Sequence, residues 1–147
     1  MLSKDFTEFI ESLNAHSVRY LVVGGYAVAF HGYPRYTKDL DIWLEPEIKN
    51  AQNVLKALNH FGFGSLDIES ADLLEENNII QLGYPPNRID LITSLKGLVF
   101  KKCYPKRVRV EIQDVLIYFI DIESLRANKK ATGRPQDLAD LENLTPE

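Results

Sequence analysis

The 147-residue sequence has little cysteine and no long apolar segment. Its single cysteine, Cys103, excludes an internal disulfide framework. No apolar run approaches the ~20 residues that a membrane-spanning helix needs, and the first residues, MLSKDFTEF, lack the apolar core of a signal peptide. We find no internal repeat, low-complexity stretch or linker. We therefore expect a cytoplasmic protein with no membrane association.

Acidic residues outnumber basic ones, and the net charge of −4 argues against a broad surface that coats nucleic acid. Residues 96–109 are a local exception, because they include several lysines and arginines and no acidic residue. This basic run has two interpretations. It is either a solvated loop and edge strand, whose lysines discourage aggregation, or a surface for polyphosphate or RNA. The sequence alone does not separate them.

The length is that of one domain by the usual range of ~100–200 residues, so we expect a single domain over residues 1–147. Apolar spacing and turn residues predict helices over residues 3–15 and 26–31, a helix opened by Pro46 and closed by Gly62, and two helices from residue 122 that break at residues 133–135. Strands are predicted over residues 20–23, 40–44, 78–82, 88–92, 108–112 and 115–120. Strands interleaved with helices, followed by a helical end, indicate an α/β (or α+β) fold.

The stretch KDLDIWL, residues 38–44, looks like a buried strand but carries two carboxylates. Side chains alternate between the two faces of a strand, so Asp39 and Asp41 would lie side by side. Asp90 is again a lone acid inside a strand pattern, RIDLI. If these two strands are neighbours, three carboxylates converge, and carboxylate oxygens are the ligands that Mg²⁺ prefers. The alternative is that all three belong to the exposed face of an amphipathic sheet.

A diglycine follows the first predicted strand, in the run VVGGYA. Glycine permits positive φ and lets a ligand approach the backbone closely. A helix that begins beyond such a turn offers free N–H groups and a partial positive charge to a phosphate. The run is neither GxGxxG nor GxxxxGK[ST], so neither a dinucleotide-binding fold nor a P-loop is indicated.

The run GGYAVAFHGYPRYTKDLDI, followed later by RIDLI, resembles the nucleotidyltransferase superfamily that includes DNA polymerase β. The most similar branch is the small one of AbiEii-type toxins and minimal nucleotidyltransferase antitoxins. Family members share a Gly-Gly/Ser turn, a DxD pair on the next strand and a third Asp on a later strand. The matching residues are Gly24, Gly25, Asp39, Asp41 and Asp90, and the branch's flanking motifs are matched by His31, Gly32, Arg35, Thr37, Lys129 and the run GRPQDLADLENL.

The resemblance implies a polymerase-β-type fold, with a mixed sheet flanked by helices and a helical C-terminus. It implies transfer of a nucleoside monophosphate from a nucleoside triphosphate to a hydroxyl of a protein such as a toxin, of an RNA end or of a small molecule. Two Mg²⁺ ions (or Mn²⁺) would be held by the three aspartates, and Asp90 would also take or orient the hydroxyl proton. The implied nucleotide-binding residues are Gly24, Gly25, Arg35, Thr37, Lys38 and Lys129.

Position 26 departs from the family pattern, because much of the superfamily has a serine there that helps to hold the triphosphate, and this chain has Tyr26. A second hypothesis is therefore a non-catalytic binding module, such as an antitoxin that neutralises its toxin by occlusion. A phosphatase of the haloacid-dehalogenase type also uses DxD. It is disfavoured because Trp43 stands where that family usually has threonine.

Other conspicuous side chains have a structural interpretation as well as a chemical one. We expect His31 to cap or pack rather than act as a base, and Trp43 to pack rather than stack on a nucleobase. Lys129 and Arg134 either grip phosphates or are ordinary charges at helix ends. Asp137 and Asp140 suit the start of the last helix, and the sequence assigns them no chemistry.

Overall fold

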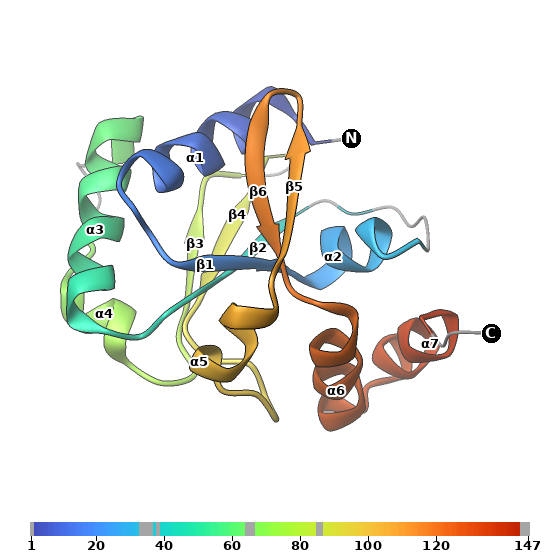
Figure 1. Cartoon of the computed structure of the whole chain (residues 1–147). Helices are drawn as coiled ribbons and strands as arrows, with labels where there is room; N and C mark the ends of the chain where they lie inside the picture. Colours follow the sequence, from blue (N-terminus) through green and yellow to red (C-terminus); the bar gives the residue numbers. More distant parts are fainter. Residues whose placement is uncertain (1, 33–36, 38, 64–66, 85–86, 145–147) are drawn as a thin grey trace.

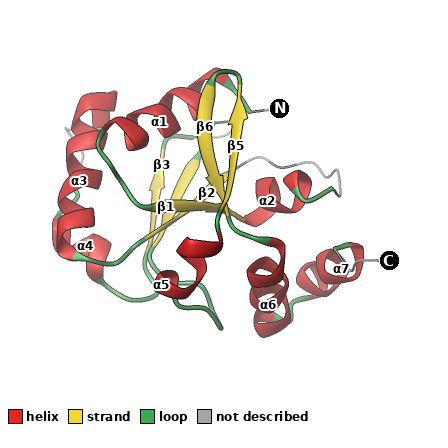
Figure 2. Ribbon diagram, viewed as in Figure 1, coloured by secondary structure: helices red, strands yellow, loops and turns green. Residues whose placement is uncertain are grey.

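A six-stranded mixed sheet flanked by helices forms the centre of the molecule (Figures 1 and 2). The computed structural model describes residues 2–32, 37, 39–63, 67–84 and 87–144. The strands are β1 (Tyr20–Val23), β2 (Leu40–Leu44), β3 (Ile79–Leu82), β4 (Ile89–Ile92), β5 (Val108–Ile112) and β6 (Val115–Phe119). The helices are α1 (Lys4–Ala15), α2 (Gly24–Phe30), α3 (Ile48–Leu58), α4 (Ser70–Leu74), α5 (Phe100–Cys103), α6 (Ile122–Thr132) and α7 (Pro135–Asn143), with shorter turns η1 (Asn59–Phe63) and η2 (Tyr104–Lys106).

The strand order is β3-β4-β2-β1-β6-β5, so neighbours in the sheet are often distant in the sequence. Strand β1 pairs antiparallel with β2 and parallel with β6. Strand β2 also pairs in parallel with β4. This arrangement confirms the predicted α/β class and a mixed sheet. It also brings β2 and β4, the two strands with in-strand aspartates, into direct contact.

Helix α1 forms where the spacing of apolar residues predicts it. Ser3 is its N-cap, and the Ser3 hydroxyl accepts a hydrogen bond from the backbone N–H of Phe6 at 3.2 Å. Phe6, Phe9, Ile10 and Leu13 recur at helical spacing and are almost completely buried. The helix packs through this face against β6 and α3.

Three predicted helix boundaries differ from the structure. Pro46 does not open α3, because Glu47 is the N-cap and its carboxylate accepts hydrogen bonds from the N–H groups of Lys49 and Asn50. Helix α3 itself ends at Leu58, and Gly62 lies inside the following turn η1, where its φ of +110° interrupts the helical geometry. Helix α2 begins at Gly24, earlier than predicted, because glycine tolerates the positive φ at this corner.

The short helices α4, α5 and η2 were not predicted. Each has five residues or fewer, which is too short for an apolar face to repeat. The β5–β6 hairpin, by contrast, was predicted with its turn. Gln113 and Asp114 both have positive φ (+53° and +66°), which suits a tight two-residue turn.

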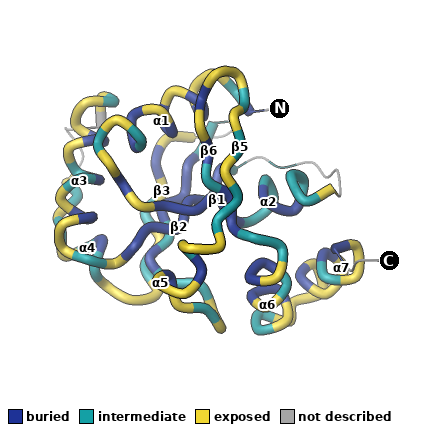
Figure 3. Tube along the Cα trace, viewed as in Figure 1, coloured by how far each residue is buried: buried dark blue, intermediate teal, exposed yellow. Residues whose placement is uncertain are grey.

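The core lies along the central strands, as the dark segments of Figure 3 show. All four residues of β1 and four of the five residues of β2 are buried, so both faces of these strands are covered. Asp41 is the exception in β2. Among the described residues, no helix combines the length and apolar character that crossing a bilayer requires.

Candidate active site

Asp41 and Asp90 are direct neighbours across the parallel β2–β4 ladder. Residues paired in this way have side chains on the same face of a sheet. Asp90 is 8% exposed, and Asp41 is partly buried. Asp39 lies just before β2, also partly buried. The sequence-based hypothesis that the three carboxylates share one region of the sheet therefore agrees with their placement.

An arginine that the sequence analysis did not single out lies between two of these carboxylates. Arg88 Nη2 donates to Asp39 Oδ2 at 2.6 Å and to Asp90 Oδ2 at 3.2 Å. Arg88 Nε lies 3.1 Å from Asp90 Oδ1. The signal was present, because Arg88 precedes Asp90 by two residues and two-residue spacing places side chains on one face of a strand.

The diglycine corner lies directly beside this cluster. Val23, the last residue of β1, pairs with Asp41 in the antiparallel ladder, and Gly24 follows with a φ of +69°. A Cβ atom built on Gly24 would overlap the Asp41 carboxylate. Glycine at position 24 thus meets two requirements, the left-handed backbone and the close approach of the carboxylate.

The charged form of the Asp41 carboxyl is disfavoured at this position. Burial raises its pKa from 3.8 to about 7, with the negative charges of Asp90 and Asp39 as further causes. The positive charges of Arg88 and Lys129 oppose this rise. Burial and the two neighbouring carboxylates thus outweigh the described cations in setting the pKa of Asp41.

The donor chemistry of the cluster fits a hard divalent cation. Among the described residues, no group of three or more His, Cys, Asp and Glu side chains is assembled as a metal-ligand set, and Arg88 separates Asp39 from Asp90. The buried Asp90 Oδ1 lies 3.1 Å from Arg88 Nε, but no described group donates to it with hydrogen-bond geometry. A cation bound by these carboxylates would satisfy that oxygen and relieve the repulsion at Asp41.

Three conspicuous residues have packing roles. Tyr26 meets Phe6 of α1 edge to face, with 5.8 Å between ring centroids. Trp43 is 1% exposed and packs edge to face against Phe100, as expected. His31 ends α2, and its Nε2 lies 2.7 Å from the Ile120 carbonyl oxygen, which ties α2 to the end of β6.

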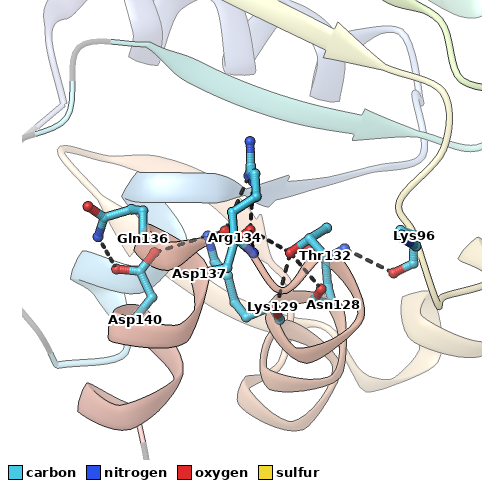
Figure 4. Close-up of polar contacts among 8 residues, drawn as sticks. All are labelled: Lys96, Asn128, Lys129, Thr132, Arg134, Gln136, Asp137 and Asp140. Carbon is cyan, nitrogen blue, oxygen red and sulfur yellow. Dashed lines mark hydrogen bonds and ion pairs between the residues drawn. The ribbon is translucent and has the colours of Figure 1, made fainter.

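Lys129 of α6 lies between two carboxylates of α7 (Figure 4). Its Nζ is 3.1 Å from Asp140 Oδ2 and 3.4 Å from Asp137 Oδ1. Asp137 Oδ2 also accepts hydrogen bonds of 2.6 Å from Arg134 Nε and from Thr132 Oγ1. Sequence reasoning gave Asp137 and Asp140 no chemistry, because their helix-start positions already had a sufficient explanation.

The pKa of Asp137 reflects this network. Burial acts to raise it, but the hydrogen bonds from Arg134 and Thr132 and the charge of Lys129 outweigh burial. Together they hold the pKa of the carboxyl well below its usual range. Asp137 is therefore a buried anion, stabilised by its neighbours.

The other predicted nucleotide-binding residues are placed less fully. Arg35 and Lys38 lie outside the described residues. Thr37 is partly buried, and Gly25 continues α2 directly after Gly24. No described contact assigns a nucleotide to any of them, so their roles stay predictions.

The basic run of residues 96–109 spreads over α5, η2 and β5. Arg107 lies over the Tyr104 ring, with its Cζ 4.0 Å from the ring centroid, and also faces Tyr118. Lys101, Lys102 and Lys106 are exposed. The run is therefore partly a packed cation–aromatic cluster, and RNA binding stays a prediction.

Comparison with solved structures identifies the fold. No family model matches the sequence, and no curated protein matches it. The chain is similar to TM1012 of Thermotoga maritima, a candidate nucleotidyltransferase, with a TM-score of 0.63, 15% identity and coverage of 94% of this chain and 88% of that one. It is also similar to the lincosamide antibiotic adenylyltransferase LnuA, solved with lincomycin bound (TM-score 0.58, 16% identity, coverage 98% and 96%). A third structure, an antigenic nucleotidyltransferase-like protein from Paracoccidioides brasiliensis, gives a TM-score of 0.53 at 18% identity, with coverage of 97% and 77%.

The fold is therefore that of a nucleotidyltransferase, as the sequence resemblance implied. These similarities extend over nearly the whole chain, at identities that establish the fold alone. The AbiEii-type branch stays a prediction.

Proposed function

We propose that this protein is a metal-dependent nucleotidyltransferase that moves a nucleoside monophosphate from a nucleoside triphosphate to an acceptor hydroxyl. The observation that carries the proposal is the register of β2 and β4, which pairs Asp41 with Asp90 beside the Gly24 corner. The nucleotidyltransferase fold supports it independently. Carboxylates on neighbouring strands beside a close backbone approach suit a polyphosphate and its cations.

Each acid has a part in this proposal. Asp39 and Asp41 would hold two Mg²⁺ ions (or Mn²⁺), and Asp90 would complete the ion nearer the acceptor. Bound magnesium would neutralise the negative charge on the phosphates and on the leaving group. Arg88, now paired with Asp39 and Asp90, would exchange these contacts when the carboxylates take a metal.

In the reaction, the acceptor oxygen forms a bond to the α-phosphorus, and the bond from that phosphorus to the bridging oxygen of the β-phosphate breaks. Pyrophosphate leaves with the electron pair of that bond. The acceptor's proton passes to Asp90, whose buried Oδ1 has an ion-pair contact with Arg88 Nε but accepts no aligned hydrogen bond from the described residues. Gly24 and Gly25 would hold the β- and γ-phosphates through the backbone, with Lys129 as a nearby cation.

The acceptor belongs to one of three classes: a protein hydroxyl, an RNA 3′ end or a small molecule. The similarity to LnuA makes ATP the first donor to test. A place in a toxin–antitoxin system, with a toxin as acceptor, is the extension that the sequence resemblance suggests.

A non-catalytic antitoxin that acts by occlusion is the second candidate. One observation favours it, because the Tyr26 ring packs against Phe6 at the position where much of the superfamily uses a serine hydroxyl. Three retained carboxylates argue against it. A binding module would also have no reason to crowd Asp41 against Asp90 and Asp39, whose charges help to raise its pKa.

Incubation with each of four α-³²P-labelled triphosphates, Mg²⁺ and a host lysate tests the proposal. We expect one labelled acceptor, whose labelling is lost with EDTA. The label should also be lost with Asp41→Asn and kept with Asp114→Asn, a change at an exposed turn residue. Equal labelling by Asp41→Asn and the wild type would refute the assignment. Absence of label with every triphosphate, combined with retained toxin binding, would favour the occlusion module.

A further inference from the structure

The burial of Lys129 calls for an explanation beyond packing. Its side chain is 8% exposed and faces Asp137 and Asp140, whose side chains are each 1% exposed. A buried ion pair stabilises a fold no better than well-packed apolar residues of similar size. Apolar residues in place of all three side chains would therefore join α6 to α7 equally well, so packing alone does not account for the buried charges.

The two carboxylates are themselves fixed in place. Asp137 accepts hydrogen bonds from Thr132 and Arg134, and Asp140 Oδ1 accepts one from Gln136 Nε2 at 2.9 Å. Figure 4 shows these side chains converging from α6 and α7. A carboxylate held by several donors cannot follow a moving ammonium. Lys129 Nζ is therefore confined to one position between the two helices.

The topology places this ammonium near the edge of the sheet at which β1 ends and Gly24 follows. Helix α6 follows β6, which runs parallel to β1, and the backbone N–H of Ile120 donates to the Val22 carbonyl at 3.1 Å. The His31 contact with Ile120 joins α2 to the same segment. The positive charge of Lys129 also acts to lower the pKa of Asp41, which agrees with this placement.

We infer that Asp137 and Asp140 are positioning residues, which hold the Lys129 ammonium at the edge of the carboxylate cluster to bind the polyphosphate of the substrate. The inference rests on the proposed function and assigns a task to α7. An ammonium has three N–H donors. The two aspartates face two of them, and no described residue takes the third, which is available for a phosphate oxygen.

Asp140 could affect the binding of an anionic ligand through its own charge or by positioning Lys129. The two effects predict opposite changes in affinity when Asp140 is neutralised. Removing a negative charge near an anionic ligand strengthens binding by simple electrostatics. Loss of the partner that fixes Lys129 weakens binding, because the ammonium must then be ordered by the ligand. Asp140→Asn keeps the shape of the side chain and so separates the two effects.

The probe is α,β-methylene-ATP with Mg²⁺, and its Kd is measured by calorimetry on the full chain. We expect Asp140→Asn to raise the Kd about tenfold. Glu142→Gln, which makes the same charge change at an exposed position of α7, should leave the Kd unchanged. In a Lys129→Met background, Asp140→Asn should have no further effect, because it acts through Lys129.

Gln136→Ala gives a second test should Asp140→Asn fail to fold, because it keeps every charge and alters an exposed residue. It should raise the Kd by a smaller factor. A Kd for Asp140→Asn equal to or below that of the wild type overturns the inference. So does a rise in Kd on Asp140→Asn that is as large in the Lys129→Met background as in the wild type. Absence of analogue binding by the wild type would instead overturn the proposed function, and the inference with it.

Discussion

Arg88 Nη2 lies 2.6 Å from Asp39 Oδ2, so the carboxylate cluster holds a cation from its own chain. The same guanidinium contacts Asp90. A divalent cation bound by Asp39 and Asp90 would compete with these contacts, because both need the same carboxylate oxygens. Arg88 therefore links the stability of the metal-free protein to its affinity for metal.

Arg88→Gln should lower the free energy of unfolding by roughly 1–3 kcal/mol without metal, because it leaves partly buried carboxylates unpaired. Added Mg²⁺ should then raise the Tm of this variant more than that of the wild type, since a ligand that binds the native state stabilises it. Thermal unfolding with EDTA and with increasing MgCl₂ measures both effects. Arg109→Gln, at an exposed cation of β5, is the control. Equal Mg²⁺-induced shifts in Arg88→Gln and the wild type would show that Arg88 and the metal do not compete.

The carboxylate strands were predictable because the signal for them is local. Alternation over residues 40–44 and 88–92 placed Asp41 and Asp90 inside strands. Their adjacency was a hypothesis, since local periodicity carries no information on which strands pair or in what register. The crossover from β2 to β4 passes through α3, α4 and β3. Only the assembled sheet places Asp41 opposite Asp90.

The residues that sequence reasoning missed either contact a partner far away in the sequence or already had a local explanation. Arg88 matters because it reaches Asp39, 49 residues away. Asp137 and Asp140 had a sufficient local explanation in the helix dipole, which hid their contact with Lys129. The short helices α4 and α5 form by packing against the rest of the fold rather than through a periodic pattern of their own.

Gly24→Ala should abolish activity, because its Cβ would overlap the Asp41 carboxylate. It should also destabilise the protein by about 1–2 kcal/mol, the strain of an L-residue at positive φ. Gly62→Ala is the matched control, since Gly62 also has positive φ but a Cβ there would meet no described atom within 4 Å. Urea unfolding and transfer assays on both variants separate strain from the clash. Normal activity in Gly24→Ala would contradict the close approach of Asp41.

The stability that Asp137 provides should depend on pH. Its folded-state pKa is lowered, so its contribution is fully present above the unfolded value of ~3.9 and is lost as pH falls below it. The difference in unfolding free energy between the wild type and Asp137→Asn should be largest at about pH 5–7, well above the unfolded-state pKa of ~3.9. It should become smaller as the pH falls towards about 3. Asp114→Asn serves as the control. A difference that stays constant over this range would show that Asp137 is not a stabilised anion.

The most direct measurement is the single-turnover rate of transfer with the preferred labelled triphosphate, compared between Asp41→Asn, Asp90→Asn and Asp114→Asn. We expect each of the first two changes to lower the rate by more than about a hundredfold while melting stays cooperative, and the third to leave it unchanged. Transfer at the wild-type rate by either Asp41→Asn or Asp90→Asn would contradict the assignment of the β2–β4 pair as the reaction centre.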